Sequence, residues 1–160
     1  MNPAPCSPVT VLLVDDVALV RDRLCSLLGE DPRIAVVGQA KDAAEAIRQS
    51  ESLRPDAVVL DYRLPDATGV EVLRHIKQSA PWCVVIMLTN LRESVFEEIS
   101  RMSGADYFFH KATEFEKVAE VLGRLAGSGR PAMLPHGGGH GGSPRSGPDA
   151  LSSANETPKR

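Results

Sequence analysis

Residues 57–69 read AVVLDYRLPDATG and carry the most informative pattern in the sequence. Ala57–Leu60 is an apolar run without polar alternation, which is typical of a strand buried on both faces of a parallel sheet. Asp61 ends this run, and a turn from Leu64 to Gly69 follows, marked by Pro, Asp and Gly. Because ligands of such sheets bind beyond the carboxyl ends of the strands, Asp61 is the first candidate for a functional residue.

Short apolar runs alternate with amphipathic stretches on both sides of this segment. The other runs expected as strands are Val9–Val14, Ile34–Ala40, Cys83–Leu88 and Tyr107–Phe109. The expected helices are Val17–Leu28, Ala43–Ser50, Val70–Lys77, Ser94–Met102 and Phe115–Leu125. Five β-α repeats joined by right-handed crossovers predict an α/β fold, a doubly wound five-stranded parallel sheet with flavodoxin-like strand order.

Polar side chains follow four of the five expected strands. Asp15 and Asp16 follow the first run, Asp61 the third, Thr89 the fourth and Lys111 the fifth. The carboxyl ends of parallel strands meet at one edge, so we expect these side chains to converge. Three neighbouring carboxylates repel one another, and a hard divalent cation such as Mg²⁺ relieves that repulsion.

This set of side chains suits phosphoryl transfer. A carboxylate held beside Mg²⁺ can attack phosphorus and form an aspartyl phosphate. Lys111 and Mg²⁺ would share the negative charge of the transferred group, and the Thr89 hydroxyl would donate a hydrogen bond to it. Asp61 is the expected nucleophile because it ends the central run and precedes the turn.

With these residues in this order, the chain resembles the receiver domain of two-component response regulators over residues 9–126. The resemblance rests on Asp15-Asp16, on Asp61 followed by Leu64-Pro65-Asp66 and Gly69, on Thr89, and on Gly104-Ala105-Asp106 before Lys111. Each motif is weak alone, but five in order on one βα framework are specific. The resemblance implies a single-domain, CheY-like (βα)5 receiver fold and a phosphorylation-dependent signalling switch.

The resemblance also implies roles for the acidic residues. Asp61 is the implied phosphoacceptor, which takes a phosphoryl group from a sensor histidine kinase or a phosphotransfer protein. Asp16 is implied to coordinate Mg²⁺ directly, Asp15 largely through water, and Arg63 through its backbone carbonyl.

Thr89 and Lys111 are implied to contact the phosphoryl group. Phe108 occupies the switch aromatic position and is expected to rotate inward when Thr89 moves toward the phosphoryl oxygens. The chain departs from the commoner family pattern here, with Phe108 in place of the frequent Tyr. Asn90 stands where a small residue is usual, and Ala112 replaces the Pro that often follows the lysine with a cis peptide bond.

Composition predicts the boundaries of the domain. Gly, Pro and Ser make up more than half of residues 127–160, and every aromatic residue precedes them. We therefore expect an N-terminal extension over residues 1–8, a receiver domain over residues 9–126 and a disordered tail over residues 127–160. The formal net charge of −3 disfavours nucleic acid and anionic membranes as partners. We find no secretory signal and no apolar run of roughly 20 residues, so we expect a cytoplasmic protein.

The expected output is contact with a downstream protein, because the tail offers no helices for a DNA-binding domain. The sequence does not decide whether phosphorylation produces a homodimer. A signalling protein rather than an enzyme is expected, with two alternatives: a small aspartyl-phosphate phosphatase and a phosphorylation-independent adaptor. Dehalogenase-like phosphatases place a second Asp two residues after the nucleophile, where this chain has Arg63.

Each polar residue also has a simpler explanation when it is taken alone. Asp16 is well placed to cap a helix that starts at Val17, and Thr89 or Asn90 to cap the helix after the fourth strand. A single lysine such as Lys111 is usually solvated. These explanations do not account for the joint occurrence of the residues at strand ends.

Overall fold

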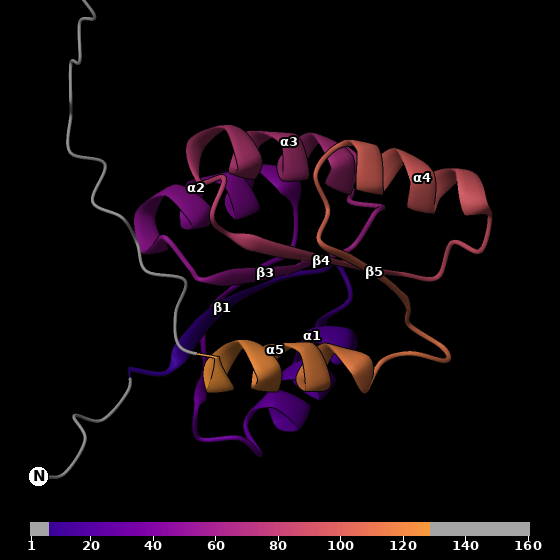
Figure 1. The fold of residues 1–160 in the computed structure, drawn as a ribbon. Helices are drawn as coiled ribbons and strands as arrows, with labels where there is room; N and C mark the ends of the chain where they lie inside the picture. The colour runs from indigo at the N-terminus through magenta and orange to yellow at the C-terminus, as the bar shows by residue number, and fades with distance from the viewer. Residues whose placement is uncertain (1–6, 129–160) are drawn as a thin grey trace, which may run out of the picture.

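The computed structural model describes residues 7–128 of the chain, and Figure 1 shows their arrangement. Within this range the strands are β1 (Val9–Val14), β2 (Ile34–Ala40), β3 (Ala57–Leu60), β4 (Val84–Thr89) and β5 (Tyr107–His110). The helices that alternate with them are α1 (Ala18–Leu28), α2 (Ala43–Leu53), α3 (Gly69–Ser79), α4 (Ser94–Met102) and α5 (Lys117–Gly127).

The strands form one parallel sheet in the order β2-β1-β3-β4-β5. This is the flavodoxin-like order, so the doubly wound α/β fold predicted from the sequence is confirmed. The order reverses between β1 and β3, where Val14 pairs with Leu60. Asp15 and Asp61 therefore follow neighbouring strand ends at the point where such sheets bind ligands.

The helices cover both faces of the sheet, as Figure 1 shows: α1 and α5 lie on one face, and α2, α3 and α4 lie on the other. The helix residues buried on the first face are Leu24, Leu28, Val118, Val121 and Leu122. On the second face they include Ala43, Ala46, Val72, Leu73 and Ile76. Every residue of β3 is buried between these layers, which explains why its sequence is continuously apolar.

The element boundaries differ from the expected ones by a few residues. Helix α3 begins at Gly69, where Thr68 and Glu71 form a reciprocal capping box. Helix α2 continues to Leu53 and ends at Arg54, which has a left-handed backbone with φ of 46°. Helix α5 begins at Lys117 rather than Phe115, whose side chain is buried in the core.

The expected terminal segments lie almost entirely outside the described residues. This applies to residues 1–6 of the N-terminal extension and to residues 129–160 of the tail. Helix α5 runs to Gly127, the first residue of the segment expected as a tail. Within the described range, no helix combines the length and the apolar character that crossing a membrane requires.

Candidate functional site

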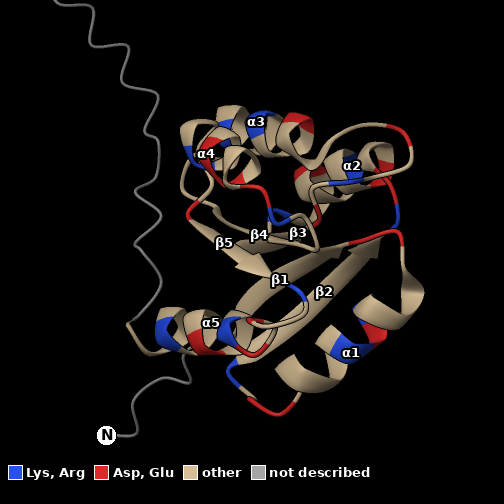
Figure 2. Cartoon of the chain, turned by 90° about the vertical axis from the view of Figure 1, so that its right-hand side faces the viewer, with Lys and Arg blue, Asp and Glu red and all other residues tan. Residues whose placement is uncertain are grey.

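Three carboxylates lie together beyond the carboxyl ends of β1 and β3. One oxygen from each of Asp15, Asp16 and Asp61 lies within 4.8 Å of the other two. The link from β1 to α1 is acidic and is drawn red in Figure 2. The side chains differ in exposure, because Asp15 and Asp61 are buried while Asp16 is exposed.

Lys111 bridges two of these carboxylates. Its Nζ lies 2.5 Å from Asp15 Oδ2 and 2.8 Å from Asp61 Oδ2, and its side chain is only 10% exposed. The backbone N–H of Lys111 donates to the carbonyl oxygen of Thr89 at 3.0 Å, which fixes the start of the loop after β5. One ammonium group thus balances charges that come from two neighbouring strands.

Burial and neighbouring charges shift the pKa values of Asp61 and Lys111. Burial raises the pKa of Asp61 above its ordinary value, and the hydrogen bond and charge of Lys111 offset this rise only in part. Burial is also the largest influence on Lys111 and favours its neutral form. Hydrogen bonds and charges from Asp15 and Asp61 nevertheless raise the pKa of Lys111, so it is a cation at neutral pH.

An open cavity of about 240 Å³ gives access to Asp61, and the residues that line it are Val17, Asp61, Arg63, Thr89, Asn90, Leu91 and Lys111. Thr89 is buried, and its Oγ1 accepts a hydrogen bond from the Leu91 N–H at 3.3 Å. Its hydroxyl hydrogen is therefore free to point to a ligand. The nucleophile candidate, the lysine and the hydroxyl thus share one solvent-accessible space.

The two adjacent aspartates have different surroundings. Asp15 Oδ1 accepts a hydrogen bond from the Val17 N–H at 2.9 Å, and Arg21 Nη1 donates to the Asp15 backbone carbonyl at 2.5 Å. Asp16 has no hydrogen bond or ion pair with any residue between 7 and 128. The interpretation of Asp16 as a helix cap is wrong, because the N-cap residue of α1 is Val17.

The turn after Asp61 forms as expected. The Leu64 N–H donates to the Ala67 carbonyl at 3.2 Å, and the Gly69 N–H donates to the Tyr62 carbonyl at 2.6 Å. The backbone N–H of Arg63 points to Asp61 Oδ1 at 3.4 Å. The Asp61 carboxylate and the backbone of Arg63 therefore lie within one hydrogen-bonded turn.

Gly69 brings the start of α3 into direct contact with the backbone of Asp61. A Cβ atom at this position would lie 2.1 Å from the carbonyl oxygen of Asp61. We expect Gly69→Ala to lower the free energy of unfolding by about 2 kcal/mol, because the helix or the acceptor loop must move. Urea denaturation checks this value, with Gly123→Ala on α5 as the control, where the nearest atoms are 3.7 Å away. Equal stabilities of the two variants would contradict the prediction.

Asp66 makes a contact that the sequence did not predict. Its two carboxylate oxygens accept hydrogen bonds from Ala43 N at 2.8 Å and from Ala44 N at 3.0 Å, at the start of α2. These bonds lower the pKa of Asp66. An Asp between Pro and Gly is explained by the turn alone, so the sequence carried no signal for this long-range cap.

The remaining candidate residues lie close to the same edge. Phe108 on β5 is half-buried, and its ring meets the His110 ring edge-on with centroids 5.7 Å apart. The alternative of Thr89 or Asn90 as a helix cap is wrong, because the N-cap residue of α4 is Glu93. All peptide bonds in the described range are trans, including the one before Ala112.

A doubly wound sheet with three carboxylates, a lysine and a hydroxyl at its switch point is the arrangement expected of a receiver of two-component signalling. The chain belongs to the response regulator receiver domain family, whose model matches residues 11–122. The family predicted from the sequence is thereby confirmed.

Relatives with this domain carry different functions. The chain is 35% identical over 130 residues to protein-glutamate methylesterase/protein-glutamine glutaminase 2 of Koribacter versatilis. The aligned region covers 77% of this chain and 36% of that protein. It is 36% identical over 124 residues to the DNA-binding transcriptional activator DevR/DosR of Mycobacterium tuberculosis. The aligned region covers 76% of this chain and 56% of that protein. The matched region is thus only part of each relative.

Solved structures show the same fold. A LuxR-family two-component response regulator from Aurantimonas has a TM-score of 0.70 at 31% identity, over 78% of this chain and 89% of that chain. The response regulator domain of Thermotoga maritima CheB has a TM-score of 0.67 at 32% identity, over 77% of this chain and 96% of that chain.

Proposed function

We propose that Asp61 accepts a phosphoryl group from a histidine kinase or a phosphotransfer protein, and that this modification switches the contacts of the domain. The observation that carries the proposal is the Asp61 carboxylate, which faces an open cavity while Lys111 and Thr89 line the same space. A carboxylate with only a structural role would not need this access. Burial of the Asp61 carboxylate raises its pKa and so disfavours its charged form.

Each residue has a defined part in the transfer. A carboxylate oxygen of Asp61 attacks phosphorus, and the bond from phosphorus to the donor nitrogen breaks. The Lys111 ammonium stabilises negative charge on the phosphoryl oxygens, and the Thr89 hydroxyl donates a hydrogen bond to one of them. The ion pair between Lys111 and Asp61 holds the carboxylate in place before the donor arrives.

The oxygen donors at this edge fit Mg²⁺. Asp16 is exposed and has no protein partner in the described range, which suits direct coordination, and both oxygens of Asp15 are engaged, which suits contact through water. Asp61 and the backbone carbonyl of Arg63 would complete the protein ligands. Bound there, the ion would supply positive charge that neutralises the phosphoryl oxygens.

Thr89 and Phe108 would carry the signal away from the site. Thr89 ends β4 and Phe108 lies on β5, the neighbouring strand. A Thr89 side chain drawn to a phosphoryl oxygen leaves space into which the half-buried Phe108 ring can turn. The output would be contact with a downstream protein, without nucleic acid or membrane binding, in a cytoplasmic protein. A homodimer formed on phosphorylation would use the same switch.

The enzyme alternative has less support. The position two residues after Asp61 is Arg63, which has no carboxyl group to act as acid or base. The methylesterase and glutaminase named among the relatives are much longer than the matched region. We therefore propose that this domain itself acts as a phosphoacceptor, with no catalysis beyond its own phosphorylation and dephosphorylation.

Locating the modified residue tests the proposed function. The protein is incubated with Mg²⁺ and a phosphorylated histidine kinase, and the acyl phosphate is reduced with borohydride before peptide mass spectrometry. The expected result is one reduced aspartate, at Asp61. Modification at Asp16 instead, or no modification with any of the host's kinases, would refute the proposal.

Trp82 gives a further prediction from the layout of β4. It precedes the strand, and Arg54 lies over its ring at 5.7 Å from the centroid. The six residues of β4 separate Trp82 from the site by roughly 20 Å. We expect its fluorescence to change little when Mg²⁺ is added.

The matched control is a Trp placed beside the site. In a Trp82→Phe background, Tyr62→Trp puts the only indole next to Asp61, where Tyr62 packs edge-on against Phe96. This protein should lose fluorescence on Mg²⁺ addition. Strong quenching of Trp82 in the natural protein would contradict the proposed position of the metal.

A further inference from the structure

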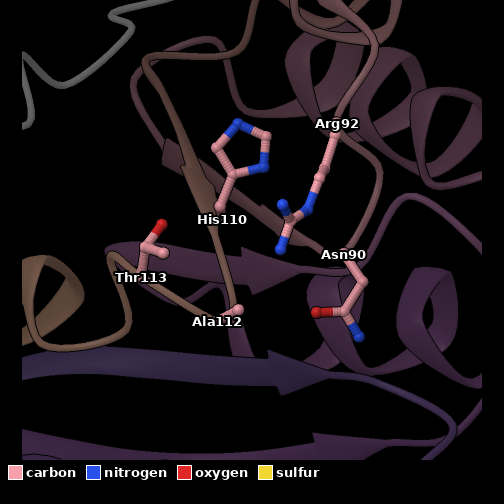
Figure 3. Close-up of a pocket in the computed structure, with 5 residues that line it drawn as sticks. All are labelled: Asn90, Arg92, His110, Ala112 and Thr113. Carbon is pink, nitrogen blue, oxygen red and sulfur yellow. The ribbon is translucent and has the colours of Figure 1, made fainter.

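A second cavity adjoins the Asp61 cavity, between the loops that follow β4 and β5. Its volume is about 370 Å³, and Figure 3 shows the residues that line it, which are Asn90, Arg92, His110, Ala112 and Thr113. We call it the Arg92 pocket. Asn90 lines both cavities, so they meet at this residue. The phosphoryl transfer described above makes no use of the Arg92 pocket.

The polar side chains that line the Arg92 pocket are Asn90, Arg92, His110 and Thr113. Figure 3 shows the Arg92 guanidinium pointing into the space between His110 and Asn90. Arg92 has neither a hydrogen bond nor an ion pair within the part of the chain that the structure describes. His110 Nδ1 is shielded from solvent and is also without a partner there. A bound anion would give the buried His110 Nδ1 a partner, since buried polar atoms normally have one, and would pair with the solvent-exposed Arg92 guanidinium.

Among residues 7–128, no carboxylate fills this place. The residues that line the pocket include one cation and no acid. Glu114 contacts the neighbouring backbone, where its Oε2 accepts a hydrogen bond from the His110 N–H at 3.0 Å. Its Oε1 accepts a hydrogen bond from Lys117 Nζ at 2.7 Å, so both oxygens are engaged. The planar guanidinium of Arg92 matches the two oxygens of a carboxylate, as it also matches those of a phosphate.

We propose that the Arg92 pocket receives the carboxylate leaving group when a small acyl phosphate donates its phosphoryl group to Asp61. This inference rests on the proposed function of Asp61. In that reaction an Asp61 oxygen bonds to phosphorus while the bond from phosphorus to the acyl oxygen breaks. The electron pair stays on the acyl oxygen, so a carboxylate leaves and no proton or redox partner is required. Arg92 lines the cavity that meets the Asp61 cavity at Asn90, and from there it stabilises that charge as it forms.

Two donors with different leaving groups test the inference. Acetyl phosphate releases a carboxylate, whereas phosphoramidate releases neutral ammonia. We expect Arg92→Gln to slow phosphorylation of Asp61 by acetyl phosphate about tenfold, the effect of losing one charge-assisted hydrogen bond. Phosphoramidate should phosphorylate Arg92→Gln and the natural protein at equal rates. Arg101→Gln, an exposed position on α4, makes the same charge change and should alter neither rate.

The possible results separate the explanations. Equal losses with both donors, or no loss with either, would overturn the leaving-group pocket. A loss confined to transfer from a phosphorylated histidine protein would also overturn it, and would assign Arg92 to an acidic side chain of that protein. Failure of the natural protein to be labelled at Asp61 by any donor would refute the proposed function instead.

Binding of the leaving group can be measured without phosphorylation. Acetate titrated into the natural protein should shift the NMR signals of the His110 ring in a saturable manner. The shift should be lost in Arg92→Gln and retained in Arg101→Gln. Absence of a saturable shift in the natural protein would contradict the inference even if the phosphorylation rates changed.

Discussion

Asp61→Asn is expected to abolish phosphoryl uptake while making the fold more stable at neutral pH. The amide has the shape of the carboxylate but cannot form an acyl phosphate, so no modified residue should remain. The ionised carboxylate is buried and is destabilised by desolvation and by the charge of Asp15, which Lys111 offsets only in part. A neutral amide removes that cost, as is common where function requires an unfavourable group.

The stability difference has a definite dependence on pH. The pKa of Asp61 is raised in the folded protein above the ordinary value of 3.8. For such a group, the folded state binds the proton more tightly than the unfolded state, and stability is lost as the pH rises through the folded pKa. Asp61→Asn should therefore exceed the natural protein in stability above that pKa, and the difference should vanish at lower pH.

Thermal denaturation at several pH values measures this difference. Asp22→Asn on α1 makes the same chemical change at an exposed position and should leave stability and phosphoryl uptake nearly unchanged. If Asp61→Asn is less stable than the natural protein at neutral pH, Asp61 is a structural residue and the argument from its raised pKa fails.

The sequence predicted the fold and the main site because both depend on regular patterns. Continuous apolar runs identified the buried strands, and four of the five strand ends placed polar residues at the same edge. The meeting of the three carboxylates, Thr89 and Lys111 could therefore be predicted before any coordinates. Element boundaries were less certain, because capping by residues such as Thr68 and Glu71 adds or removes a turn.

Contacts between distant loops were not predictable in the same way. Asp66 caps α2 across more than twenty residues, and nothing in its local sequence distinguishes this role from a turn residue. Arg92 and His110 meet in one pocket because the loops after β4 and β5 lie side by side. In the sequence neither residue differs from an ordinary polar residue, so only the coordinates show that they line one cavity.

Lys111→Met is expected to cause the largest loss of stability among these variants, about 3 kcal/mol at neutral pH. The side chain is nearly buried, and its removal leaves Asp15 and Asp61 close together without the cation that bridges them. Breaking a buried ion pair by deleting one partner leaves an uncompensated charge, which is more costly than losing an exposed pair. Lys117→Met is the control, because its pair with Glu114 is exposed and is expected to contribute less than about 1 kcal/mol.

The stability lost in Lys111→Met depends on pH through the protonation of both Lys111 and Asp61. The pKa of Lys111 is raised in the folded state, so its stabilising contribution is fully present below the pKa of an unfolded lysine, which includes neutral pH. At acid pH, Asp61 takes up a proton and one of the two pairs is lost, so the difference from the natural protein should shrink.

Mg²⁺ and phosphorylation distinguish the electrostatic role of Lys111 from simple packing. Because the variant has two uncompensated carboxylates, Mg²⁺ should raise its melting temperature more than that of the natural protein. Phosphorylation of Asp61 should slow by about a hundredfold, since one group that stabilises the phosphoryl oxygens is missing. Equal effects of Mg²⁺ on both proteins would mean that Lys111 contributes by packing alone. The ion pair would then not be the reason that three acidic groups can share one edge of the sheet.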